Sequence, residues 1–256
     1  MTALALKTYG WRELLAAPSA PSMPFMLGLD LAIAMPISWM PLVSDYTRHA
    51  AVPGRGIRGT WWGYFIVSSW MYAVGLVAAL ATGSGAPESM LLQLMGGHGL
   101  LVPALLVVLL STLTTTFLDI YSNAVSAQSL FPKMGTRGLV LLAGGAGTLI
   151  ALFFDATKYE AFLLFIGSAF CPLFGVVLAD YFILKRGCYV AEDLYRRGRY
   201  WYAGGVNWRA MGAWAAGFGV YHACAKTGFA GGASIPAMGL AAAMYLLISM
   251  KTKGRT

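Results

Sequence analysis

The chain has 256 residues, of which 58% are hydrophobic and only 11% are charged, and its formal net charge is +8. Soluble domains carry about 25% charged residues, so this composition excludes a soluble globular protein and indicates an integral membrane protein. The three cysteines are widely spaced, and no HExxH or phosphate-binding loop occurs, so neither a disulfide framework nor a metal site is expected. Basic residues are scattered between apolar stretches, which argues against a nucleic-acid partner.

The chain begins with residues 1–25, which contain three prolines and no apolar run long enough to span a bilayer, so we predict an external segment. Seven apolar stretches follow, each near the roughly 20 residues that a membrane-spanning helix needs. Their bounds are 26–44, 60–81, 100–118 (continuing to 130), 138–154, 161–184, 211–225 and 235–250. The sequence therefore predicts an all-α polytopic membrane protein with about seven transmembrane helices.

The first apolar stretch, LGLDLAIAMPISWMPLVSDYTR over residues 27–48, contains Pro36 and Pro41. Proline removes one helical hydrogen bond, and a broken helix in hydrocarbon is tolerated only where the freed groups are buried or line a cavity. Secondary transporters commonly build substrate sites on such helices. We therefore expect irregular backbone between the prolines, presenting Ser38 and Trp39. The alternative is an ordinary proline kink that neighbouring helices repair.

The third stretch carries a second unusual pattern, STLTTTFLDIYSN, over Ser111–Asn123. Helical geometry places Ser111, Thr114 and Thr115 on one face. Hydroxyl and backbone oxygens are the ligands that a small cation such as Na⁺ would need, so the pattern predicts a cation site. The alternative is that the hydroxyls simply bond to carbonyls one turn earlier in the helix.

Asp119 follows one turn after these hydroxyls, and an ionisable side chain inside a span is a functional candidate by default. A polar stripe then runs along one helix face through Ser111, Thr115, Asp119 and Asn123. The alternative for Asp119 is a carboxylate that is solvated near the cytoplasmic end or paired with Lys133.

Two further carboxylates lie near the ends of spans. Asp45 and Arg48 are spaced as an i,i+3 pair, and Asp180 precedes Lys185 and Arg186. We interpret both as structural or gating ion pairs rather than as ligands.

Basic residues are distributed unevenly among the loops. Alternate loops, beginning with the one after the first span, hold all 18 Lys and Arg residues except Lys7, Arg12, Lys158 and Lys226. The positive-inside rule places the basic loops in the cytoplasm, where some attraction to anionic lipid head groups is expected. The sequence thus predicts a multi-pass protein of the inner (plasma) membrane, with its N-terminus outside and its C-terminus in the cytoplasm.

Three segments resemble a known family. They are SWMPLVSDYTR (38–48), FLDIYSNAVSAQSLFP (117–132) and residues 171–210, in which PLFG and ADYF precede a basic loop and GGVNWRA. These motifs resemble the nucleobase:cation symporters, also called purine/cytosine permease-like transporters, and among them the branch associated with hydroxymethylpyrimidine, a thiamine precursor. The resemblance covers nearly the whole chain.

The resemblance implies a LeuT-type fold of two inverted five-helix repeats and two accessory helices. Aligned on the motifs, residues 26–184 correspond to helices 6–10 of the family, 185–210 to a cytoplasmic loop, 211–250 to the accessory helices and 251–256 to a cytoplasmic tail. Helices 1–5 have no counterpart in the chain. A separate half carrying them is therefore an expected partner, and we expect no substrate uptake by the chain alone.

The resemblance also places the family's broken substrate helix around Met35–Trp39, its cation face near Thr114 and Thr115, and a substrate-contacting position at Asp119 or Asn123. The candidate substrate-binding residues are Met35, Ser38, Trp39, Asp119 and Asn123, and the candidate cation-binding residues are Ser111, Thr114 and Thr115.

Secondary active transport, by cation symport, of a pyrimidine-like nucleobase or of a thiamine precursor such as hydroxymethylpyrimidine is the function that these patterns predict. The ring would stack on Trp39, while Asp119 or Asn123 would bind its N–H and amino groups. No cofactor is expected beyond a coupling ion, Na⁺ or H⁺. A non-transporting remnant or partner subunit is the main alternative. A channel is less favoured, and so is a membrane-embedded enzyme, because no nucleophile–base pair or metal cluster falls in the spans.

Overall fold

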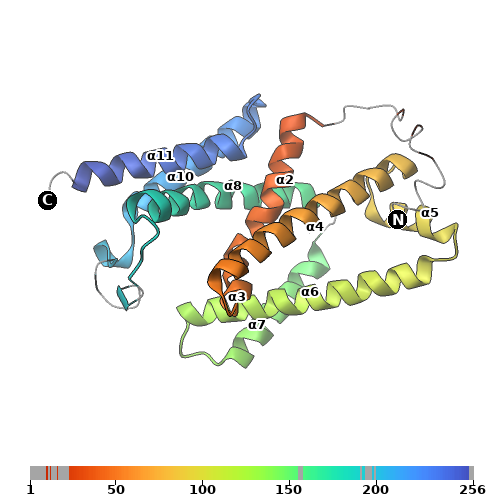
Figure 1. The fold of residues 1–256 in the computed structure, drawn as a ribbon, viewed down its shortest axis with the longest axis horizontal. Helices are drawn as coiled ribbons and strands as arrows, with labels where there is room; N and C mark the ends of the chain where they lie inside the picture. The colour runs from red at the N-terminus through yellow and green to blue at the C-terminus, as the bar shows by residue number, and fades with distance from the viewer. Residues whose placement is uncertain are drawn as a thin grey trace. The chain divides into compact units, whose positions relative to one another are not determined.

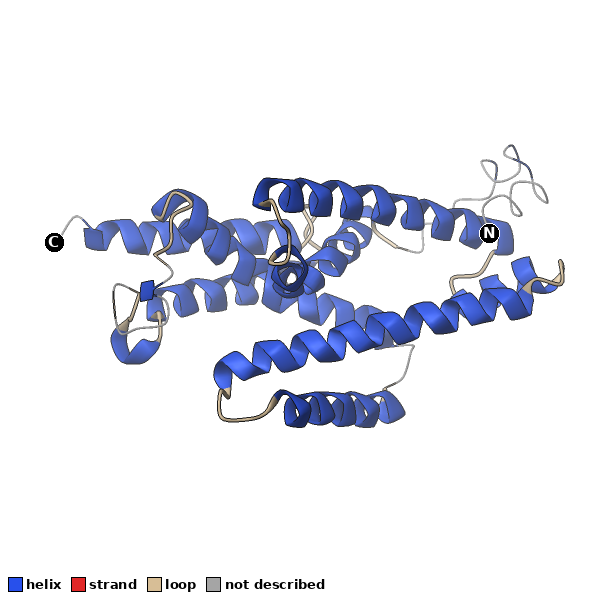
Figure 2. Ribbon diagram, turned by 60° about the horizontal axis from the view of Figure 1, so that its bottom comes forward, coloured by secondary structure: helices blue, strands red, loops and turns tan. Residues whose placement is uncertain are grey.

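The structure is a computed structural model, and it describes residues 23–154, 158–190, 192–193, 198 and 200–253, together with positions 10, 12 and 16. Throughout these residues the chain folds into helices joined by loops, and no strand occurs among them (Figure 1 and Figure 2). The predicted external segment 1–25 lies largely outside this part of the chain, as do residues 254–256 of the predicted tail. The predicted all-α architecture is confirmed.

The described helices cover all seven of the predicted apolar stretches. They are α2 (Phe25–Trp39), α3 (Val43–Thr47), α4 (Pro53–Thr82), α5 (Pro87–Gly96), α6 (Leu101–Leu130), α7 (Thr136–Phe153), α8 (Tyr159–Leu178), α10 (Trp208–Thr227) and α11 (Ser234–Lys253). Of these, α5 is an addition that the apolar pattern did not predict.

Local sequence explains where two of the helices begin and end. A proline starts α4, because at the first helical position its missing N–H has no intrahelical partner to lose. The Asn207 side chain accepts the N–H of Ala210 at 3.2 Å and so caps α10. Both helices end at a glycine in the left-handed conformation, Gly83 (φ 63°) and Gly228 (φ 62°), where a Cβ would be strained.

The first apolar stretch departs from its predicted form. Helix α2 continues through Pro36 to Trp39, so Ser38 and Trp39 lie in regular helix and the irregular backbone expected at these two residues is wrong. The irregularity comes later, in the 3₁₀ turn Met40–Leu42. Pro41 has no N–H to give to the Ile37 carbonyl, and the N–H of Met40 donates to that carbonyl instead, in the tighter 3₁₀ pattern. The structure is therefore closer to the alternative of an ordinary proline kink, in which the freed carbonyl finds a new donor. That donor comes from α2's own C-cap residue, Met40, and not from a neighbouring helix.

The chain forms two compact units. Unit 1 contains residues 42–153 and therefore α3 to α7. Unit 2 contains residues 21–41 and 154–256; in it α2 packs with α8 and α11, and α10 packs with the same two helices. This division by packing differs from the predicted division by repeats, which grouped α2 and α8 with the helices of unit 1. The inverted repeat itself stays a prediction.

In unit 2 the helices pack through small residues, as close packing in lipid requires. Figure 1 shows α8, α10 and α11 side by side, and α8 also contacts α2. A Cβ on Gly175 of α8 would lie 2.3 Å from the carbonyl oxygen of Met238 on α11. A Cβ on Gly217 of α10 would lie 2.5 Å from the Cβ of Pro172 on α8. Only glycine fits at these two contacts.

In unit 1 most of the apolar surface stays exposed. A small core of Ala78, Ala81 and Leu94 joins α4 to α5, and α6 packs against α7. Large apolar side chains along α6 nevertheless remain uncovered, including Leu110 at 62% and Phe117 at 67% exposure. Such surface is suited to lipid or to a partner protein.

Five helices in the described part of the chain are long and apolar enough to cross a membrane, judged by length and composition. They span Phe25–Asp45, Pro53–Thr82, Leu101–Gln128, Thr136–Phe153 and Tyr159–Leu184. The apolar part of α11, Ser234–Met250, is shorter, and α10 falls below the same criteria. All seven predicted stretches are thus helical, and five of them have the full character of a span.

Candidate functional site

A polar stripe on α6 holds most of the residues predicted to bind substrate or cation. Thr115 Oγ1 donates to the carbonyl oxygen of Ser111 at 2.9 Å, and Asn123 Nδ2 donates to the carbonyl oxygen of Asp119 at 3.0 Å. These i,i+4 contacts place the stripe on one helix face, as predicted. The half-buried Asp119 forms no ion pair with Lys133, although the structure describes both residues.

The hydroxyls of the two threonines predicted to bind the cation, Thr114 and Thr115, bond to their own helix. Thr114 Oγ1 lies 3.1 Å from the carbonyl oxygen of Leu110 and 2.9 Å from that of Ser111. Such back-bonding is the alternative that the sequence left open. It uses the hydroxyl hydrogen and leaves oxygen lone pairs available to a cation. In the described part of the chain, no group of three or more His, Cys, Asp and Glu residues is placed to hold a metal. The cation site therefore stays a prediction.

The other predicted residues lie at the end of α2, in unit 2. Ser38 Oγ donates to the carbonyl oxygen of Met35 at 2.7 Å, so this hydroxyl also bonds to its own helix. Met35 is 40% exposed and Trp39, one turn later, is half-buried, so both retain accessible apolar surface. The predicted substrate residues thus fall into two sets, one on α2 in unit 2 and one on α6 in unit 1.

Asp30 of α2 is not among the residues predicted from the sequence, yet it is buried, at 6% exposure. Its two carboxylate oxygens accept the N–H groups of Ala233 and Ser234, each at 2.8 Å. These N–H groups stand at the N-terminus of α11, where they lack intrahelical partners and where the helix dipole favours a negative charge. Asp30 thereby joins α2 to α11. An ionisable residue inside the first apolar stretch was the signal in the sequence.

Two buried hydroxyls stand on the helices around this contact. Tyr221 of α10 and Ser234 of α11 are 2% and 1% exposed, and neither hydroxyl has a hydrogen-bond partner among the described residues. Gly232 passes close to the carboxylate with φ 73°, and a Cβ there would lie 3.1 Å from Asp30 Oδ1. The Asp30 contact is thus tightly enclosed by three helices of unit 2.

Comparison with known proteins identifies the family. The family model described as "Permease for cytosine/purines, uracil, thiamine, allantoin" matches residues 3–247. The chain belongs to this family. The resemblance read from the motifs is thereby confirmed at the level of the family, and the family together with the apolar helices supports a multi-pass membrane protein.

Curated relatives agree with this assignment. The chain is 26% identical to the hydantoin permease of Microbacterium maritypicum over 78% of its own length, and 26% identical to the cytosine permease of Escherichia coli (strain K12) over 69%. It is 27% identical to the allantoin permease of Bacillus subtilis (strain 168) over 74% of its length. These matches cover 44%, 41% and 41% of the three relatives, so the chain spans less than half their length. No solved structure matches the chain significantly.

In this member of the family the ADYF and GGVNWRA motifs are joined by hydrogen bonds. Asp180 of ADYF lies in a π-helical turn, Ala179–Leu184, that extends α8. Its carboxylate accepts the hydroxyl of Tyr189, and it accepts the hydroxyl of Tyr245 on α11 at 2.8 Å. Asn207 of GGVNWRA donates to the Tyr245 hydroxyl oxygen at 3.3 Å. The two motifs thus meet at Tyr245.

This network corrects one prediction. In the described part of the chain Asp180 forms no ion pair with Lys185 or Arg186, so an ion-pair role is wrong for this carboxylate. The Lys185 ammonium lies instead over the ring of Tyr200, 5.0 Å from its centroid. Burial, together with the hydrogen bond to Asp180, raises the pKa of Tyr189, so its hydroxyl remains protonated and able to donate.

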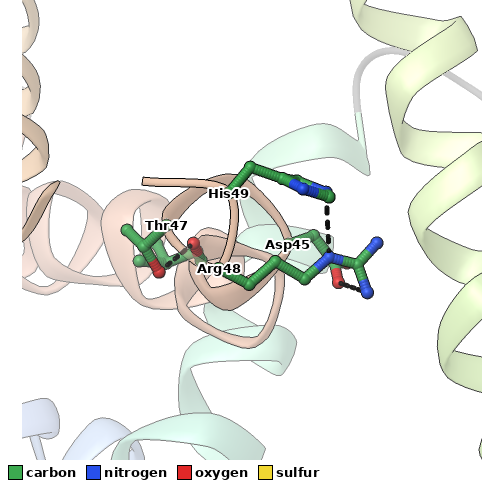
Figure 3. Close-up of polar contacts among 5 residues, drawn as sticks. Asp45, Thr47, Arg48 and His49 are labelled. Carbon is green, nitrogen blue, oxygen red and sulfur yellow. Dashed lines mark hydrogen bonds and ion pairs between the residues drawn. The ribbon is translucent and has the colours of Figure 1, made fainter. Parts of the chain in front are cut away.

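The Asp45–Arg48 pair, in contrast, forms as predicted (Figure 3). Arg48 Nη1 lies 3.8 Å from Asp45 Oδ1, and Arg48 Nε donates to His49 Nε2 at 3.2 Å. Thr47 Oγ1 donates to the Val43 carbonyl oxygen at 3.1 Å. The Arg48 side chain is 44% exposed, so this pair contributes little to stability.

We expect Asp30→Asn to destabilise the protein. The asparagine amide keeps one oxygen that can accept a backbone N–H, but its NH₂ group faces the other backbone N–H. Two hydrogen-bond donors then face each other, and one of the two hydrogen bonds is lost. Hydrogen bonds to charged groups are worth about 1.5–3 kcal/mol, so the thermal midpoint of the purified chain in detergent should fall clearly. Asp45→Asn is the matched control, and its more exposed pair should cost about 1 kcal/mol or less. Equal shifts for the two variants would contradict a structural role for Asp30.

Proposed function

We propose that this permease carries out secondary active transport, by cation symport, of a pyrimidine-like ring, with hydroxymethylpyrimidine as the favoured substrate. The observation that carries the proposal is the family match over residues 3–247. The named relatives are permeases for hydantoin, cytosine and allantoin. All three compounds are small rings that carry N–H and C=O groups. A binding site for such a ring needs a flat apolar surface and a few polar partners.

Both requirements have candidates in the chain. Trp39 on α2 supplies an indole that retains exposed surface, and Met35 adds apolar surface one turn away. On α6, Asp119 supplies a carboxylate that accepts ring N–H or amino groups, and Asn123 lies one turn further along the same face. The hydroxyls of Ser111, Thr114 and Thr115 are proposed to lie beside the coupling ion, Na⁺ or H⁺.

Substitution of the two candidate substrate residues tests the proposal. Base–aromatic stacking is worth about 1–3 kcal/mol per base, and an unpaired buried polar group costs about 1–3 kcal/mol. Trp39→Ala and Asp119→Ala should therefore each raise the dissociation constant for labelled hydroxymethylpyrimidine about ten-fold or more. The measurement uses membranes that contain the chain, expressed alone and together with the part of the E. coli cytosine permease that lies outside the match.

Trp70→Ala is the matched control, because this tryptophan lies on α4 and is 62% exposed. It should leave the dissociation constant unchanged. Competition by unlabelled cytosine, hydantoin and allantoin ranks the substrates. Unchanged affinity in both test variants would remove these residues from the substrate site, and stronger competition by cytosine than by hydroxymethylpyrimidine would overturn the finer substrate assignment.

The cation assignment is tested on the two threonines of the predicted face. Thr114→Ala combined with Thr115→Ala should reduce the stimulation of substrate binding by Na⁺, and should change binding without Na⁺ much less. Thr148→Ala is the control, because its hydroxyl makes a similar bond, 2.8 Å to the Gly144 carbonyl oxygen, on a different helix, α7. Insensitivity to Na⁺ together with dependence on a proton gradient would make the ion site wrong and Asp119 the candidate proton carrier.

The orientation is tested by single-cysteine labelling in intact cells, in a background without Cys188 and Cys224. The unequal distribution of Lys and Arg places residue 84 outside and residue 198 in the cytoplasm. A membrane-impermeant maleimide should therefore label Ser84→Cys and should label Gly198→Cys only after the cells are opened. The reverse pattern would invert the proposed topology.

A further inference from the structure

An apolar groove of about 410 Å³ runs along one side of the contact between α8 and α11. One wall follows a single face of α8 and its π-helical turn, through Gly175, Leu178 and Phe182. The other wall follows a face of α11, through Ile235, Gly239 and Ala242. The side chains of both walls are entirely apolar. The groove therefore offers no partner for the N–H and C=O groups of a nucleobase, and it is separate from the proposed substrate residues.

The packing of unit 2 explains why this groove stays open. On its other side, the α8–α11 contact is covered by α10, where Ala213 is completely buried together with Val176 and Ala241. Gly175 lets the α8 backbone lie directly against Met238 of α11, so the two helix backbones touch at that point. The π-helical turn then widens α8 where Asp180 turns toward Tyr245, and it leaves Phe182 on the groove wall.

Position and charge indicate what the groove holds. Much of its length belongs to Tyr159–Leu184, one of the helices long and apolar enough to cross a membrane, so the apolar chain of a lipid is the occupant that its walls and position favour. Along α8 the lining extends from Gly175 to Ile183, about 12 Å at 1.5 Å per residue. Lys185 and Arg186 follow directly at the end of the groove. Arg186 is exposed and has φ 51°, an uncommon conformation for a residue other than glycine.

We propose that this groove is a binding site for an anionic phospholipid, with an acyl chain between α8 and α11 and the head-group phosphate at Lys185 and Arg186. Apolar walls complement the acyl chain, and the two cations complement the phosphate. Each Lys or Arg near a membrane surface favours anionic lipid by about five-fold. The site is distinct from the transport site, so it can be tested whether or not the proposed substrate is correct.

Gly239→Leu is the test of the acyl-chain part. A Cβ on Gly239 meets nothing within 4 Å, so the leucine side chain extends into the groove without disturbing the helices. Native mass spectrometry of the purified chain should show at least about ten-fold weaker retention of dioleoylphosphatidylglycerol, because the leucine displaces several methylene groups. Gly219→Leu is the matched control. It lies on α10, is also exposed and also meets nothing within 4 Å, and it should retain the lipid as the unmodified chain does.

The head-group part has its own pair of variants. Lys185→Gln combined with Arg186→Gln should reduce the preference for phosphatidylglycerol over phosphatidylcholine by about five-fold or more. Lys226→Gln removes a positive charge from the last turn of α10 and should leave the preference unchanged. An equal preference in the double variant would overturn the assignment of the phosphate to these residues.

A smaller substitution keeps the proposal falsifiable if the leucine variant does not fold. In the same cysteine-depleted background, phosphatidylglycerol should slow maleimide labelling of Gly239→Cys more than phosphatidylcholine does. Equal labelling with the two lipids, or unchanged lipid retention by a folded Gly239→Leu chain, would overturn the proposal. Loss of a chain dimer in Gly239→Leu with lipid retention unchanged would also overturn it, and would show a second copy as the occupant.

Discussion

In the hydrocarbon core of a bilayer a backbone N–H or C=O group has no water to bond with, so each must find its partner within the protein. Three features of this chain satisfy that constraint in different ways. At Pro41 the Ile37 carbonyl loses its usual donor, and the helix tightens so that Met40 replaces it. At the start of α11 the Asp30 carboxylate accepts two N–H groups. On α6 the constraint is already met, and the threonine hydroxyls add second donors to the helix carbonyls.

The same constraint explains how unit 2 holds α11. This helix has little amphipathic character to orient it, yet carboxylates from two other segments bind it at separate points. Asp30 binds its first N–H groups, and Asp180 accepts the hydroxyl of Tyr245 further along. Between them Met238 packs against Gly175 at a distance that excludes any side chain. A carboxylate that is taken out of water needs hydrogen-bond donors. Because α11 supplies donors to both Asp30 and Asp180, the two carboxylates fix the position of this helix.

The sequence predicted what depends on local pattern and left open what depends on distant partners. Apolar length located all seven stretches, and i,i+4 spacing placed Asp119 and Asn123 on one face, as the structure shows. The prolines correctly indicated that the helix is interrupted in this region. The sequence could not show that Ser38 and Trp39 stay in regular helix and that the backbone changes to a 3₁₀ turn only at Met40–Leu42. Asp180 was assigned to its nearest basic neighbours, whereas its partner Tyr245 is remote in sequence and becomes visible only once α8 and α11 are packed.

The polar stripe on α6 is not accounted for by helix packing within the chain. Large apolar side chains surround it and are exposed, as expected for a helix that meets lipid. Asp119 and the Asn123 amide lie on the same helix and are not enclosed by other helices of unit 1. A carboxylate facing lipid would cost several kcal/mol or more, whereas the neighbouring leucines and phenylalanine would cost nothing there. In the membrane this face must therefore meet protein or a water-filled cavity while the rest of α6 meets lipid. The proposed transport would need such an arrangement, because a polar substrate must remain in contact with polar groups of the protein while it crosses.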